Sequence, residues 1–75
     1  MTAKETTVRE LKTLTGSTIV ISTPDADLRG VVESASRQFV TLADVEAVSG
    51  PEPVALSGFV LVPVSRISYI QVVPR

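Results

Sequence analysis

Two short segments hold the residues best suited to binding chemistry. Arg37, Gln38 and Phe39 are consecutive, and Arg66 lies in a second polar segment after Pro63. A guanidinium group binds phosphate oxygens, an amide side chain can hydrogen-bond a base edge, and an aromatic ring can stack on a base. If the fold brings the two segments together, these four residues could bind a single-stranded nucleic acid.

A structural role is the competing interpretation of the same residues. Arg37 and Arg66 would then solvate turns and pair with Glu33 or Asp44, in exposed contacts worth about 0–1 kcal/mol. Phe39 opens an alternating strand pattern, which favours a core position for its ring. Seven basic and eight acidic residues leave a net charge of −1. The chain therefore lacks the basic surplus typical of nucleic-acid-binding proteins.

The sequence holds little that could catalyse a reaction or bind a metal ion. It contains no His and no Cys, which excludes Ser-His-Asp and Cys-His catalytic arrangements and thiolate metal sites. Asp25 and Asp27 flank Ala26, but turn chemistry explains both and no further carboxylate follows close by. We therefore expect a binding or assembly protein with no catalytic residue, no metal, no cofactor and no small-molecule substrate.

The first part of the chain predicts one short helix, over residues 7–15. Thr7 and Glu10 have the spacing of a capping box, and Gly16 is a typical helix end. Apolar residues recur at helical spacing at Val8, Leu11 and Leu14. This stripe indicates a helix that lies on an apolar surface.

From Ser17 onward the apolar residues alternate, as they do in strands. Turn residues divide this part into five predicted strands, at residues 17–23, 28–35, 38–46, 54–63 and 67–73. Gly30 lies inside the second strand, where a strongly bent strand would need a missing side chain. The 75 residues are enough for one domain, over 1–75. We expect an all-β fold, in which a five-stranded, strongly bent antiparallel sheet forms a small barrel.

The last two predicted strands are apolar and uncharged. No charged residue occurs between Pro53 and Ser65 or between Ile67 and Pro74. An apolar edge strand of this kind promotes aggregation unless something covers it, and so short a chain buries only about 60% of its unfolded surface. Either the barrel closes internally, or copies of the chain pair edge to edge as a homo-oligomer. The interface residues expected in the second case are Phe59, Val60, Leu61, Val62, Ile67, Tyr69, Ile70 and Val72.

The order of elements resembles the Sm-like family, which includes the Hfq-like proteins. The matching segments are Leu28–Ser34 (LRGVVES) and Gln38–Leu42 (QFVTL), and the ending at residues 67–75 is similar to the family's last strand. The resemblance implies a short helix before five bent strands that form a small SH3-like barrel. It also implies homo-oligomeric rings in which the fourth strand of one subunit pairs with the fifth of the next. For function, it implies single-stranded RNA binding at the pore face through Arg37, Gln38, Phe39 and Arg66.

Two segments depart from that family's pattern. The turn at residues 35–38 reads Ala-Ser-Arg-Gln, where family members usually carry an Asp, and residues 63–66 replace an aromatic-Lys-His segment. The alternative function is therefore an Sm-like barrel that serves as a structural or protein–protein interaction module without nucleic acid.

The Met1 end has no apolar stretch, and the longest apolar run, Phe59–Val64, has the length of a strand. We expect a cytoplasmic protein that does not contact a membrane.

Overall fold

A short helix precedes the sheet. The computed structural model describes residues 9–74, of which residues 9–13 are helical. The last turn tightens, because the Leu14 amide donates to the Leu11 carbonyl over 3.1 Å, and the chain leaves it through Gly16 at φ +85°. The helix therefore ends earlier than the predicted residue 15. Thr7 of the predicted capping box and Val8 of the apolar stripe lie outside the described residues.

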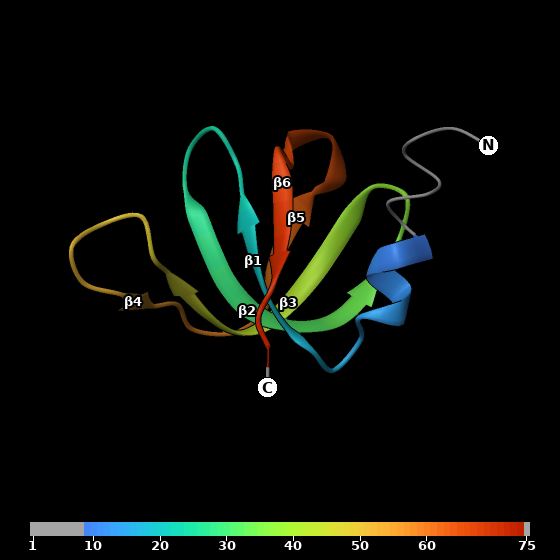
Figure 1. Cartoon of the computed structure of the whole chain (residues 1–75), viewed down its shortest axis with the longest axis horizontal. Coiled ribbons are helices and arrows are strands. Elements are labelled where there is room, and N and C mark those ends of the chain that lie inside the picture. Colours follow the sequence, from blue (N-terminus) through green and yellow to red (C-terminus); the bar gives the residue numbers. More distant parts are fainter. Residues whose placement is uncertain (1–8, 75) are drawn as a thin grey trace.

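Six strands and one 3-10 helix follow: β1 (Thr18–Ser22), β2 (Asp27–Ala35), β3 (Phe39–Ala47), β4 (Val54–Ala55), β5 (Val60–Pro63), η1 (Val64–Arg66) and β6 (Tyr69–Val72). All strand pairs are antiparallel, and the sheet has the order β4-β3-β2-β1-β6, with β5 also paired to β3. Figure 1 shows that β2 and β3 curve strongly, so that the sheet wraps around its own inner face. The predicted class, an all-β bent sheet behind a short helix, is confirmed.

The prediction of one strand at residues 54–63 is wrong, because two strands occupy this range. Both pair with β3, since Ala55 lies opposite Glu46 and Val60 lies opposite Leu42. Between them the chain leaves β3 at residues 57–59, where Gly58 has a φ of +76°. On β3, Asp44 at φ 51° interrupts the ladder at the same place. Left-handed backbone at Gly58 and at Asp44 of β3 therefore accompanies the division of the predicted strand in two.

The strong bend of β2 depends on Gly30, as the sequence predicts. A Cβ atom at this position would lie 3.1 Å from the Ala43 carbonyl oxygen and 3.2 Å from the Leu42 Cβ. The pairing between β2 and β3 also shifts register twice, at Gly30 itself between Arg29 and Val31, and again between Val32 and Ser34. The missing side chain and the two irregularities let β3 cross close over β2.

The core fills the inside of the bend. Its fully buried side chains are Leu11, Ile19, Ile21, Val32, Val40, Leu42 and Val45, and Val62 and Val64 complete it. Leu11 of this core comes from the helix, which lies at one end of the barrel in Figure 1. Aliphatic residues alone make this core, in agreement with the composition of the chain.

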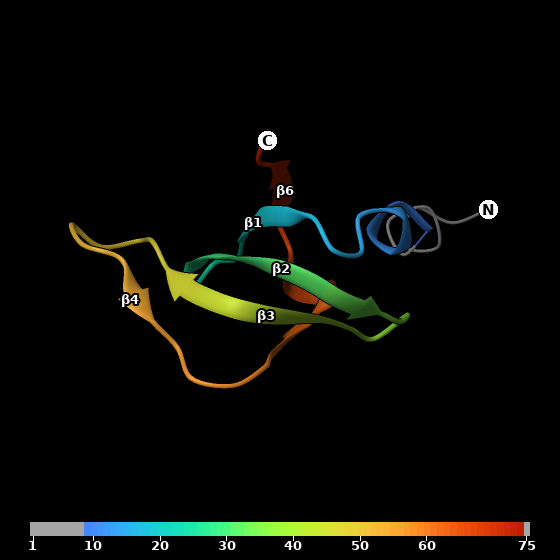
Figure 2. The same ribbon diagram turned by 90° about the horizontal axis from the view of Figure 1, so that it is seen from below.

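The sheet is left open between its two edges. In the described part of the chain, β5 pairs only with β3, and β6 pairs only with β1. Figure 2, seen from below, shows β6 on one side of the curved sheet and β4 on the other. Internal closure by pairing of β5 with β6 is therefore not how residues 9–74 are arranged. Across the same range, no helix is both long and apolar enough to cross a membrane.

Candidate functional site

The turn between β2 and β3 is shaped by Ser36. Its hydroxyl accepts hydrogen bonds from the amides of Gln38 (3.3 Å) and Phe39 (3.2 Å), and its amide donates to the Phe39 carbonyl over 2.8 Å. Serine commonly stabilises tight turns in this way. Arg37 and Gln38 form the tip of the turn, and both are exposed.

The second predicted segment, η1, lies directly beside this turn. The Val64 amide donates to the Gln38 carbonyl over 2.9 Å, and Pro63 is the pairing partner of Phe39. The Val64 side chain is buried, so the 3-10 helix is held against the barrel as well as against the turn. The two segments singled out in the sequence are therefore neighbours in the fold.

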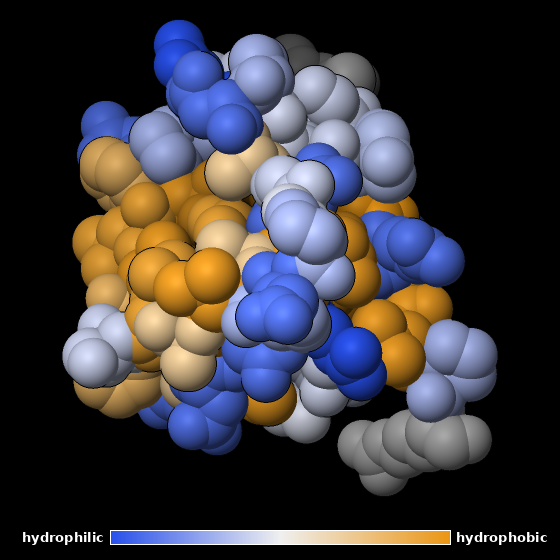
Figure 3. All heavy atoms as spheres, turned by 90° about the vertical axis from the view of Figure 1, so that its left-hand side faces the viewer, coloured by the Kyte–Doolittle hydropathy of each residue, from blue (hydrophilic) through white to orange (hydrophobic). Residues whose placement is uncertain are grey.

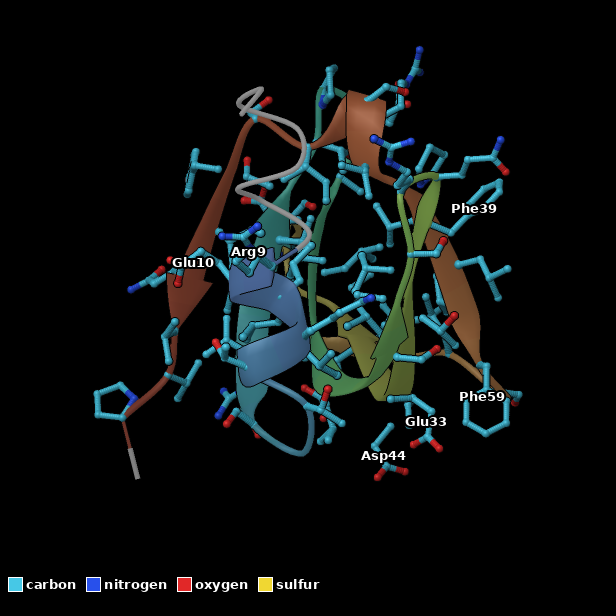
Figure 4. The ribbon with its side chains drawn as sticks, turned by 90° about the vertical axis from the view of Figure 1, so that its right-hand side faces the viewer. Arg9, Glu10, Glu33, Phe39, Asp44 and Phe59 are labelled. Atoms are coloured by element: carbon cyan, nitrogen blue, oxygen red, sulfur yellow. The ribbon has the colours of Figure 1, made fainter. Side chains whose placement is uncertain are left out.

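Arg66 at the end of η1 makes an ion pair that the sequence did not indicate. Its Nη2 atom donates to Oδ2 of Asp25 over 2.9 Å, although the two residues are 41 positions apart. Asp25 lies in the turn between β1 and β2. Glu33 and Asp44, the partners considered from the sequence, lie in the lower part of the view in Figure 4, below Phe39. A contact between two distant turns leaves no signal in the local sequence pattern.

The Phe39 side chain is 39% exposed, so the core position favoured by its strand pattern is wrong. The neighbouring Val40 and Leu42 point inward and are fully buried, and Phe39 consequently points outward. In Figure 4 its ring lies on the same side of the molecule as that of Phe59. The exposed ring adjoins Arg37 and Gln38, where an aromatic surface could stack on a base.

The outer side of β5 is apolar. Leu61 and Phe59 are each more than half exposed, and Leu61 lies opposite Thr41 of β3. Figure 3 shows an apolar area over one half of the face it displays, on the side of β4 and β5. Val62 differs from the other predicted interface residues, since it is only 3% exposed and belongs to the core. Its side chain is therefore not available to a second subunit, whereas its backbone lies on the free edge of β5.

The opposite edge, β6, exposes Tyr69 and Val72. Val72 pairs with the fully buried Ile19 of β1, and paired residues share one face of a sheet. Val72 therefore lies on the inner face of the sheet, although it is 51% exposed. Three other predicted interface residues, Val60, Ile67 and Ile70, are half-buried and pack against the core.

A groove of about 640 Å³ follows the free edge of β5. One wall is the turn between β1 and β2, and the other is β5 with η1. Its lining residues are Thr23, Asp25, Ala26, Leu28, Val60, Leu61, Val62, Pro63, Ser65 and Arg66. Among the described residues no group of three or more carboxylate, His or Cys side chains could hold a metal ion.

Comparison with known proteins identifies the architecture. The sequence matches no protein-family model and no curated protein. Among solved structures, a heptameric archaeal Sm protein superposes with a TM-score of 0.78 at 20% identity, over 88% of this chain and 98% of that one. The chain has the Sm fold.

Two further Sm-fold structures agree with this assignment. The SmAP1 heptamer of P. aerophilum gives a TM-score of 0.79 at 20% identity, over 89% of this chain and 92% of that one. The Sm protein of Pyrococcus abyssii in complex with a uridine heptamer gives 0.75 at 16% identity, over 87% and 94%. The predicted resemblance to the Sm-like family is thus confirmed at the level of the fold.

Proposed function

We propose that this chain forms a homo-oligomeric ring in which β5 of one copy pairs with β6 of the next. The observation that carries the proposal is the pair of free edges at the two ends of the sheet. In Figure 4, β5 lies on one side of the barrel and β6 on the other. A contact between two different surfaces of identical subunits repeats head to tail, and it closes into a ring when the rotation between subunits permits.

The chemistry of the two edges supports this pairing. Residues 54–65 and 67–74 contain no charge, so neither edge carries the Lys or Glu that commonly prevents strand association. Leu61 and Phe59 on one edge and Tyr69 and Val72 on the other expose apolar surface that a neighbouring copy would bury. The heptameric state of two similar Sm-fold structures also supports a ring.

On one face of that ring we propose a binding site for single-stranded RNA. The turn with Arg37 and Gln38 adjoins η1, and the Phe39 ring is exposed beside them. Repeated around a ring, these residues would supply stacking surfaces, amide groups and positive charge to consecutive nucleotides. The complex of the P. abyssii Sm protein with a uridine heptamer supports single-stranded RNA as the class of ligand.

Two observations favour the alternative of an interaction module without nucleic acid. The net charge of the chain is −1, and the guanidinium of Arg66 is already paired with Asp25. The two functions are separated by fluorescence anisotropy of a labelled oligouridine titrated with the purified full chain. Saturable binding that weakens with added salt supports the RNA site. Unchanged anisotropy with an intact ring leaves the interaction module as the function.

A further inference from the structure

The Arg66–Asp25 ion pair links two parts of the candidate RNA face. Asp25 belongs to the turn between β1 and β2, where Thr23 Oγ1 accepts hydrogen bonds from the amides of Asp25 (3.3 Å) and Ala26 (3.1 Å). The Thr23 amide also donates to the Ala26 carbonyl over 3.0 Å. The backbone of the turn is thus ordered by Thr23, and the carboxylate of Asp25 remains available for Arg66.

The pair joins Arg66 to a different turn from the one that holds the other candidate RNA residues. Figure 1 shows η1 between two turns, with the β1–β2 turn on one side and the β2–β3 turn on the other. Arg37, Gln38 and Phe39 belong to the β2–β3 turn and the start of β3, whereas the guanidinium of Arg66 is bonded to the β1–β2 turn. In this conformation the guanidinium of Arg66 faces a carboxylate, which offsets part of its charge.

The contact is of a kind that a phosphate can displace. A single N–O pair joins the two groups, and the side chains of Arg66 and Asp25 are 58% and 75% exposed. Ion pairs this exposed contribute little, about 0–1 kcal/mol. Only one guanidinium nitrogen of Arg66 is bonded to Asp25. The guanidinium has further N–H groups that can donate to a second anion.

We propose that the Asp25 carboxylate competes with RNA phosphates for the guanidinium of Arg66. This competition lowers the affinity of the ring for single-stranded RNA. RNA binding would transfer the guanidinium from the Asp25 carboxylate to a phosphate oxygen. The proposal rests on the RNA-binding function proposed above, and it assigns to Asp25 a regulatory role that its place in a turn did not suggest. Loss of the carboxylate then strengthens RNA binding.

Asp25→Asn tests this idea with almost no change of shape. The side chain is not the group that Thr23 binds, so the turn is expected to persist. Affinity of the full chain for a labelled oligouridine is measured by fluorescence anisotropy, with native mass spectrometry to check assembly. We expect affinity to rise about twofold to fivefold, the range that corresponds to release of one exposed ion pair.

Two matched variants separate this role from a general effect of charge. Asp27→Asn removes one negative charge two residues away and leaves the Arg66–Asp25 pair intact, so it is expected to change affinity less than Asp25→Asn. In an Arg66→Ala background, Asp25→Asn is expected to leave the affinity for oligouridine unchanged, because this protein has no guanidinium at position 66 to release. Equal gains with and without Arg66, or no gain from Asp25→Asn alone, would overturn the proposal.

The outcome for the unaltered protein keeps this inference distinct from the function on which it rests. If the wild-type chain binds oligouridine and Asp25→Asn binds no better, the competitor role fails while the RNA site stands. If neither protein binds at any salt concentration, the RNA site itself fails and the inference fails with it. If only Asp25→Asn binds, the competitor role is supported, and the unaltered chain is the interaction module of the alternative function.

Discussion

The Val64 amide donates a 2.9 Å hydrogen bond to the Gln38 carbonyl. This bond joins the 3-10 helix after β5 to the turn between β2 and β3, and it makes one surface from two distant segments. Since Val64 is also buried in the barrel, the position of this surface is set by the core. The two segments of the candidate RNA face are therefore joined to each other and to the core.

Replacement of Leu61 by Lys is expected to break the ring without unfolding the subunit. Leu61 is more than half exposed on β5, so a lysine is tolerated in a single copy but places a charge in the apolar contact between copies. Size-exclusion chromatography with light scattering should report single subunits at concentrations where the wild type is a ring.

The matched control for this change is Glu52→Lys, in the exposed loop before β4. It adds a lysine away from both edge strands and should leave the mass unchanged. Val62→Lys is unsuitable as an edge test, because the side chain is buried and the change would disrupt the core. An intact ring in Leu61→Lys would contradict pairing through β5.

Phe39→Ala is expected to weaken binding to single-stranded RNA at least about fivefold, since stacking of a base on an aromatic ring is worth about 1–3 kcal/mol. Phe39→Tyr keeps a stacking surface and should retain most of the affinity. Titration of labelled oligouridine, at a protein mass verified to be that of the wild type, measures both. Equal affinity of the alanine variant and the wild type would remove Phe39 from the site.

Ser36→Ala tests whether the turn must be ordered for function. The change removes the hydroxyl that accepts from the amides of Gln38 and Phe39, and each hydrogen bond contributes about 1 kcal/mol. We expect the free energy of unfolding to fall by about 1–2 kcal/mol in urea denaturation at fixed protein concentration, together with weaker RNA binding. Ser65→Ala, at an exposed serine of η1, serves as the control for loss of a hydroxyl. Identical urea midpoints for Ser36→Ala and the wild type would show that the turn does not depend on this side chain.

Gly30→Ala is expected to destabilise the fold by about 1–3 kcal/mol, the usual cost of overpacking a core. Its Cβ would lie 3.1 Å from the Ala43 carbonyl oxygen, which is backbone and cannot move aside cheaply. The companion variant is Gly50→Ala, whose Cβ would meet its nearest neighbour only at 4.0 Å. Thermal denaturation should show a lower midpoint for Gly30→Ala and little change for Gly50→Ala. Similar midpoints for the two variants would mean that the close crossing of β2 and β3 is not required.

The class of the fold could be predicted from the sequence, because it follows from the apolar periodicity. The bend of β2 could also be predicted, because it follows from the missing side chain of Gly30. The predictions failed where they depended on which face of a strand points into the core. Alternation marks β3 as a strand, but it does not state that Val40 is buried and Phe39 exposed. The same ambiguity put Val62 among the interface residues. The break of the strand at 57–59 depends on left-handed backbone at Gly58 and at Asp44 of β3, which residue types alone do not reveal.

The sequence predicted the segments of the candidate site but not the partner of Arg66. Arg37, Gln38 and Arg66 were singled out as turn residues, and the fold places their segments side by side. The partner of Arg66 was missed, since Asp25 lies 41 positions away and its turn was fully explained by local chemistry. Long-range polar contacts between turns require the fold to be known.

The central claim, a ring closed through β5 and β6, is tested most directly by native mass spectrometry of the purified full chain. The spectrum should contain one closed oligomer of several subunits, with no ladder of intermediate sizes, because each copy offers one β5 edge and one β6 edge. Additional mass from bound nucleotides would support the RNA site in the same experiment. A spectrum dominated by single subunits at micromolar concentration would contradict the ring.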